Sequence, residues 1–310
     1  MSSPSSVTAV GGSATEEEHS ASSAGRVIRV LRAFAKMPWL TKLCFLWLIL
    51  VVLAAALADL IPGLADPNYQ GFVFGDGKTN EGPTASHWLG TDNVSRDILA
   101  RLIYGARVSL IFAFSLAAIG IIVGGTLGSI AGYFRGLLET FLMALVDTWL
   151  SFPALIGLVF ITTMLGMRNL VVLVLVGAVF IWPSYTRIAR ATALSVSGQA
   201  FVTAARAIGT SRKRILVREI FPNVLPALLA YSLVGLPILI ILESTLSFLG
   251  LGVEIPTASW GGMINQARQD LLIYIWPAVW PAVTLFMTVY SFNNLADWVR
   301  TQAAARSAAI

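Results

Sequence analysis

The chain has 310 residues, of which 56% are hydrophobic and 12% are charged, whereas soluble domains carry roughly a quarter of charged residues. This composition excludes an ordinary soluble globular protein and indicates that lipid is the solvent. A single cysteine, Cys44, excludes an intrachain disulfide, and the sequence has no zinc-ligand spacing. The net charge is +5. In a membrane protein such a charge reflects topology, so no nucleic-acid partner is expected.

Six charge-free runs predict the fold. Each run holds 16 to 27 residues, close to the roughly 20 that an α-helix needs to cross the hydrocarbon layer. We therefore expect an all-α, polytopic membrane protein with about six transmembrane helices. The runs are 43–58, 108–134, 148–167, 169–186, 220–242 and 271–296.

The distribution of Lys and Arg predicts the orientation. Six spans place both termini on the same side of the membrane. The segments on that side hold 15 Lys and Arg residues, and those on the opposite side hold 6. Because positive charge accumulates on the cytoplasmic side, both termini are expected in the cytoplasm.

The segments outside the spans differ in character. Residues 1–36 are expected to form a cytoplasmic N-terminal segment that is disordered at first, where Ser, Ala, Thr and Gly dominate. Within it, residues 25–36 read as an amphipathic helix on the membrane surface. The transmembrane domain is expected over 37–300, with an external loop at about 62–106 that contains several Pro and Gly. Residues 301–310 are expected to be a cytoplasmic tail.

The basic cytoplasmic loop at about 187–222 has a pattern of its own. Residues 201–208 have helical character, Gly209 is suited to a left-handed helix stop, and Ser211 can cap the next helix. The sequence therefore predicts a short helix, a sharp turn and a second helix that enters span five. A short helix held parallel to the membrane by two spans can act as a lever.

This loop resembles the cytoplasmic "EAA loop" of bacterial ABC importer permeases. The family pattern is Glu-Ala-Ala, three residues, Gly, and a Pro thirteen residues after the Gly. Ala204, Ala205, Gly209 and Pro222 match the pattern, and Thr203 stands where the family has Glu. The small alanines would let another protein approach the helix closely.

Four further segments resemble the C-type permeases of dipeptide, oligopeptide and nickel importers, and they occur in the family's order. They are the region that begins H-W-L-G-T-D at 87–92, D-x2-L-S-F-P at 147–153, E-x2-L-S-F-L-G-L-G-V at 243–253, and S-W-G at 259–261. The resemblance covers about residues 40–300. It implies the fold of an ABC type I importer permease and a location in the cytoplasmic (inner) membrane of a bacterium.

The resemblance also implies partners. They are a homologous second permease subunit, two ABC ATPase subunits, an extracytoplasmic peptide-binding protein and the surrounding lipids. ATP and Mg would be used by the ATPases, so this chain is expected to bind no cofactor and to be no enzyme. It would couple ATP hydrolysis to uptake of di- and oligopeptides, with nickel chelates or glutathione as alternative cargoes. The ATPase-docking residues implied are Thr203, Ala204, Ala205, Arg206, Gly209 and Pro222.

Several alternatives stay open at the level of sequence. Asp147 and Glu243 lie at or within span ends, where a carboxylate is either a pore or gate residue or is paired, for example with Arg187. A secondary transporter that works alone is a rival to the importer, although no internal repeat supports it. Four basic loop residues are either topology determinants that touch anionic lipid or ATPase contacts; they are Arg212, Lys213, Arg214 and Arg218.

Overall fold

The computed structural model describes residues 37–75 and 77–307, so the predicted N-terminal segment 1–36 lies outside the described residues. Within the two described ranges the only β-type pairing is an isolated bridge between Thr91 and Asp97. The helices in chain order are α2 (Trp39–Ala56), α3 (Gly71–Phe74), α4 (Ile98–Ile119), α5 (Gly125–Phe134), α6 (Gly136–Leu150), α7 (Ala154–Leu165), α8 (Leu170–Ser197), α9 (Ala200–Ala207), α10 (Arg212–Ile215), α11 (Phe221–Phe248), α12 (Trp260–Ala267) and α13 (Trp276–Ser307). Shorter elements are the 3₁₀ turn η1 (Ala58–Leu60) and the π-helical turns η2 (Gly120–Gly124) and η3 (Leu216–Ile220).

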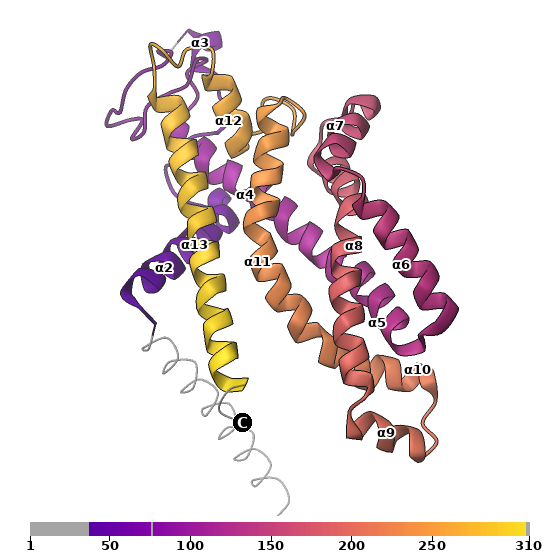
Figure 1. Cartoon of the computed structure of the whole chain (residues 1–310). Coiled ribbons are helices and arrows are strands. Elements are labelled where there is room, and N and C mark those ends of the chain that lie inside the picture. Colours follow the sequence, from indigo (N-terminus) through magenta and orange to yellow (C-terminus); the bar gives the residue numbers. More distant parts are fainter. Residues whose placement is uncertain (1–36, 76, 308–310) are drawn as a thin grey trace, which may run out of the picture. The chain divides into compact units, whose positions relative to one another are not determined.

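α2 crosses the boundary between two compact units, Met1–Leu43 and Cys44–Ile310, and α4 to α13 all belong to the second unit. Within that unit, Figure 1 shows α3 and α12 at one end of the helices and α9 and α10 at the other end.

Four helical stretches of the described chain are long and apolar enough to cross a membrane, and a fifth is counted if the bent pair α6 and α7 is one broken span. The four are α2, α4 through α5, α8, and α10 through α11. The sixth predicted run, 271–296, falls mostly in α13, which has 32 residues but is not counted, because Pro, Thr and Asn dilute its apolar residues. The all-α, polytopic architecture is therefore confirmed, whereas the count of six spans is not reproduced in full.

The third predicted span differs most from the structure. Run 148–167 does not form one helix, because the chain breaks between α6 and α7 and the two helices are bent by 77°. Pro153 stands at the break, directly before α7. Its ring removes a backbone donor, and it disfavours helical backbone at Phe152. The apolar run is thus divided by a single proline.

Two other boundaries are shifted. The predicted external loop ends at residue 97 instead of 106, because Asp97 accepts a hydrogen bond from the Ala100 amide and caps α4. At the other end of the chain, α13 continues through 301–307, which the sequence assigns to a tail.

Two apolar clusters form the core of the second unit. The larger cluster joins α2, α4, α7, α8, α11, α12 and α13, and it includes the fully buried Phe112 and Trp260. The smaller cluster joins α5, α8, α9, α10, η3 and α11 around Tyr185 and Ile215. We call the smaller one the loop cluster, because it ties the 198–215 connection to the spans.

A row of glycines lets two spans touch along their backbones. Every fourth residue from 120 to 132 is glycine, and each of the four faces α8. A Cβ added to Gly128 would lie 2.2 Å from the Thr186 carbonyl oxygen. A Cβ on Gly132 would lie 2.6 Å from the Arg190 carbonyl oxygen. Small residues at this spacing permit close helix packing in lipid, and we call this contact the glycine seam.

The seam predicts a large difference between two glycine substitutions. Gly128→Ala places a methyl group against backbone, so we expect a loss of about 1–3 kcal/mol of stability and a lower thermal unfolding midpoint in detergent. Gly235→Ala, on α11, is the matched control, because no atom lies within 4 Å of the added Cβ. Equal midpoints for the two variants would contradict the seam.

Candidate coupling loop and buried polar sites

α9 carries most of the predicted coupling residues, and its two faces differ in burial. Val202 has no exposed surface and packs with Ile215 in the loop cluster. Ala205 is half-buried against the same cluster. Ala204 is exposed on the other face, and Ile208, directly after the helix, is 81% exposed. α9 is thus fixed to its own chain along one face and open along the other.

The turn after α9 is a Schellman motif. Gly209 has a φ of +80°, which confirms the predicted left-handed helix stop. Its amide donates to the Arg206 carbonyl at 3.0 Å, and the Thr210 amide donates to the Ala205 carbonyl at 3.1 Å. These two bonds satisfy the last carbonyls of α9. A side chain at position 209 would strain this backbone, because L-residues rarely adopt a positive φ.

The second helix of the loop runs directly into span five. Ser211 stands at the N-cap of α10, as predicted, but its side chain makes no capping hydrogen bond. The helix then continues from α10 through η3 into α11 as one stretch. Pro222 lies just after η3 and has no N–H to donate to the preceding turn. The π-helical turn accommodates this missing bond, so Pro222 marks the point where the loop becomes a span.

The structure adds two residues that the sequence analysis did not single out. Phe201, at 39% exposed, and Ile208 lie three residues before and four residues after Ala204. Residues at this spacing share one face of a helix, and we call Phe201, Ala204 and Ile208 the outer stripe. The sequence contains a signal for the outer stripe, namely apolar residues at helical spacing in a loop that is otherwise basic. Thr203 is also exposed, and Arg206 lies over the ring of Tyr133.

Asp147 forms a surface ion pair. Its carboxylate accepts a hydrogen bond from Arg187 Nη2 at 2.5 Å, which confirms the pairing that the sequence left as an alternative. Both side chains are more than half exposed, so the pair contributes little to stability. Glu139 and Arg190 form a second ion pair between the same two helices, α6 and α8.

Glu243 lies in the interior of the described helices. It has no exposed surface. Ser109 on α4 donates to Glu243 Oε2 at 2.6 Å, and Ser247 on α11 donates to Glu243 Oε1 at 2.6 Å. Ser244 lies 3.5 Å from the same Oε2 atom. The carboxyl therefore links α4 to α11 through hydroxyl groups, and in this conformation it does not face an open pathway.

A second buried polar cluster lies where the loop predicted to be external, called the external loop below, meets α12. The Arg101 guanidinium is 1% exposed, and its Nη1 donates to the carbonyl oxygens of Pro67 and Pro256 at 3.0 and 3.1 Å. Its Nε lies 3.6 Å from Asp92 Oδ2, and Gln266 Oε1 is 3.4 Å from its Nη2. Arg101 thus ties three segments that are distant in sequence.

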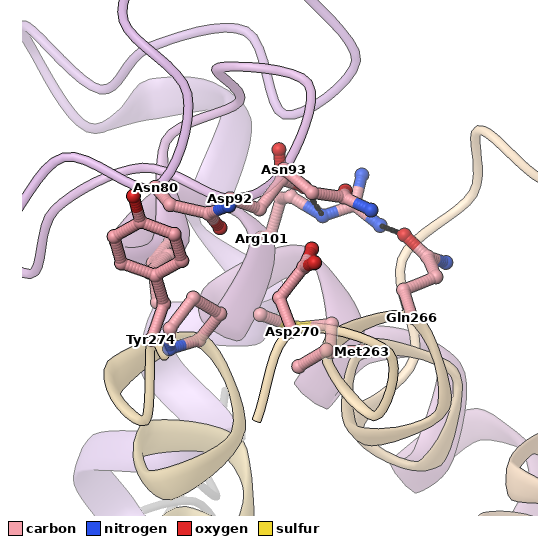
Figure 2. Close-up of a pocket in the computed structure, with 11 residues that line it drawn as sticks. Asn80, Asp92, Asn93, Arg101, Met263, Gln266, Asp270 and Tyr274 are labelled. Carbon is pink, nitrogen blue, oxygen red and sulfur yellow. Dashed lines mark hydrogen bonds and ion pairs between the residues drawn. The ribbon is translucent and has the colours of Figure 1, made fainter. Parts of the chain in front are cut away.

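Figure 2 shows the pocket beside Arg101, with Asn80 and Asp92 above and Asp270 and Tyr274 below. The cavity between them is about 10 Å³, close to the smallest volume that holds one water molecule. These side chains therefore close the external loop onto α12 instead of opening a space for cargo.

A third contact joins the end of α2 to α4. The Arg107 Nη2 atom lies 2.9 Å from Asp59 Oδ2, and the Tyr104 hydroxyl donates to Asp59 Oδ1 at 2.8 Å. These hydrogen bonds, the one from Arg107 first, hold the pKa of Asp59 below its usual value. The Asp59 carboxylate is therefore ionised at every pH at which a surface aspartate with the ordinary pKa is ionised.

The Glu243 cluster predicts different stabilities for two substitutions. Glu243→Ala leaves two buried serine hydroxyls without their acceptor, so we expect a loss of about 1–3 kcal/mol of stability. Glu243→Gln keeps one acceptor oxygen and adds a donor that a serine can accept, so its unfolding midpoint should stay close to that of the wild type. Thermal unfolding of both variants in detergent measures this difference. An unchanged midpoint for Glu243→Ala, together with lost transport, would contradict the structural role and favour a gate.

Comparison with known proteins assigns the family. Residues 124–307 match the family model described as "Binding-protein-dependent transport system inner membrane component". The chain is 35% identical over 225 residues to the glutathione transport system permease protein GsiD of Pectobacterium atrosepticum. The matched region is 72% of this chain and 74% of the relative. It is also 35% identical over 257 residues to the proteins of that name from Escherichia coli O157:H7 and Shigella boydii. In each comparison the matched region is 82% of this chain and 82% of the relative. The chain therefore belongs to the binding-protein-dependent transport system inner membrane component family, the permease subunits of ABC type I importers in the bacterial inner membrane.

Proposed function

We propose that this chain is one of two homologous channel-forming subunits of an importer with two ATPase subunits, one of which docks on the outer stripe of α9. The observation that carries the proposal is the division of α9 into one face anchored in the loop cluster and one face left open. ATP and Mg would be bound by the ATPase subunits, because this chain has no G-x-x-x-x-G-K-[ST] phosphate loop.

The outer stripe has the properties of a docking surface. Ile208 is 81% exposed although it is apolar, and Phe201 is 39% exposed on the same face. Between them, Ala204 offers little side chain, so a partner can approach the helix axis closely. Apolar side chains that gather on a water-facing loop mark contact sites for other proteins. Ala205 is a poorer candidate for direct contact, because it packs against its own chain.

The buried face of α9, opposite the outer stripe, explains how movement of a docked ATPase would be transmitted to the spans. Val202 and Ile215 are fully buried in the loop cluster. That cluster also contains residues of α5, α8 and α11, so α9 cannot shift without them. Closure of the ATPase pair would therefore move the docked loop together with these spans, as a rigid-body change between two states.

The cargo and orientation complete the proposal. The excess of Lys and Arg on one side supports cytoplasmic termini, with the binding protein on the side of the external loop. The cargo is a short peptide. The names of the relatives support this class, because glutathione is itself a tripeptide. Nickel chelates are the alternative that the C-type resemblance leaves open.

An uptake assay with one surface variant tests the proposal. The importer is reconstituted in liposomes with its ATPase subunits, its binding protein and ATP, and uptake of labelled glutathione, dipeptides, longer peptides and nickel is measured. We expect uptake of short peptides that requires ATP. Ala204→Trp should reduce uptake about tenfold or more and reduce co-purification of the ATPase, because the indole blocks the close approach at an exposed site.

Two controls make the assay specific. Ile208→Asp should act like Ala204→Trp, because it places a charge on the same apolar stripe. Uptake by the purified chain without an ATPase would contradict the proposal and favour a secondary transporter. Uptake of nickel alone would keep the importer and replace its cargo.

A further inference from the structure

A basic pocket lies between the end of α5 and the turn after α9. Its volume is about 430 Å³, within the range of small-molecule sites. Its wall combines two aromatic rings, two guanidinium groups, a hydroxyl and one buried aliphatic side chain. The lining residues are Tyr133, Phe134, Arg206, Thr210, Arg212 and Ile215.

Among the residues that the structure describes, no carboxylate pairs with the two arginines of the pocket. The ion pairs of residues 37–75 and 77–307 include neither Arg206 nor Arg212. Both side chains are exposed, in contrast to the paired arginines near Asp92. The neighbouring basic residues are also free of ion pairs within the described part of the chain; they are Arg135, Lys213, Arg214 and Arg218. The pocket therefore carries two positive charges that no ion pair of the described residues neutralises.

The pocket is partly organised in advance. The Arg206 guanidinium lies over the Tyr133 ring, 5.2 Å from its centroid, and a cation in this position is attracted by the ring face. Tyr133 is itself 8% exposed and packs edge-on against Phe134 at 5.2 Å. The Thr210 backbone is held by the hydrogen bond that its amide donates to the Ala205 carbonyl. One guanidinium and the backbone that carries one hydroxyl are thus positioned before any ligand arrives.

The surroundings of the pocket favour an amphiphile over a soluble anion. Phe134 is the last residue of the span that α4 and α5 form, and Arg212 is the first residue of the stretch that continues into α11. Apolar side chains at the start of α6 follow directly after Phe134, with Leu137 90% exposed and Phe141 68% exposed. A basic site at a span end that borders an exposed apolar face matches the phosphate and acyl chains of one lipid.

We propose that this pocket binds the phosphate of an anionic phospholipid, with Arg206 and Arg212 on the phosphate and the acyl chains along the exposed face of α6. Arginine suits this ligand, because its planar donors match phosphate geometry. The Thr210 hydroxyl is available as a further donor. The lipid would belong to the inner leaflet of the membrane, and this assignment rests on the proposed orientation. The lipid would brace the turn at Gly209 and so hold α9 in place.

Native mass spectrometry of the full importer with added lipid tests this site. Phosphatidylglycerol is titrated into the detergent-solubilised complex, with phosphatidylcholine and inorganic phosphate as separate arms. We expect phosphatidylglycerol to bind best and Arg206→Gln with Arg212→Gln to weaken it about tenfold or more. Lys213→Gln with Arg214→Gln removes the same charge outside the pocket lining and should weaken it less than about threefold.

Three outcomes would overturn the proposal. Equal weakening by the two double variants would mean diffuse attraction to the surface, and binding of inorganic phosphate as tight as that of the lipid would mean a soluble anion. Loss of the ATPase from Arg206→Gln with Arg212→Gln, at unchanged lipid affinity, would assign the pocket to the ATPase.

Two further variants keep the test informative. Thr210→Val leaves the backbone bonds of the turn intact, so it reports on the site even if the double variant folds poorly, and we expect it to weaken lipid binding by about threefold. Ala204→Trp should lose the ATPase and keep the lipid. This result separates a failure of the lipid site from a failure of the proposed coupling.

Discussion

The close approach of α5 to α8 is the constraint on which the rest of the structure depends. In lipid, two apolar helices gain little from the hydrophobic effect, so they are held by packing and by backbone proximity. Glycine at every fourth position from 120 to 132 supplies that proximity, because any Cβ there would strike α8. Directly below the seam lies the loop cluster, in which Val202 is fully buried. The seam and the cluster together make α5, α8, α11 and α9 one packed body.

Buried polar groups determine which helices and loops lie against one another in this packing. Glu243 and Arg101 are both withdrawn from solvent, and each bonds to elements that are far apart in sequence. An unpaired polar group inside a membrane protein is costly, so such groups persist where their partners are in place. Glu243 joins α4 to α11, and Arg101 closes the external loop onto the segment before α12. The two clusters thus fix one arrangement of helices at the end opposite α9 (Figure 1).

The sequence predicted the parts of the protein that depend on local chemistry. Composition indicated the membrane, and Gly209 predicted the turn because few other residues adopt a positive φ. Other features depend on tertiary contacts that a run of letters does not display. Glycines at four-residue spacing are common in membrane helices, so only the position of α8 reveals the seam. Pro153 broke an apolar run that hydropathy alone reads as one span. The outer stripe needed the burial of Val202 to show which face of α9 is open.

The central claim is that α9 and α8 move as one body when ATP binds. Electron-spin distance measurements on the full importer test it directly, with Cys44 replaced by Ala and labels at two exposed sites outside the predicted docking residues, Gln199→Cys at the N-cap of α9 and Val171→Cys at the start of α8. The account predicts that the distance between these labels changes by no more than about 2 Å between the nucleotide-free and ATP-bound states. A shift of about 5 Å or more, one helical turn, would show that α9 moves independently of its span and would contradict the account.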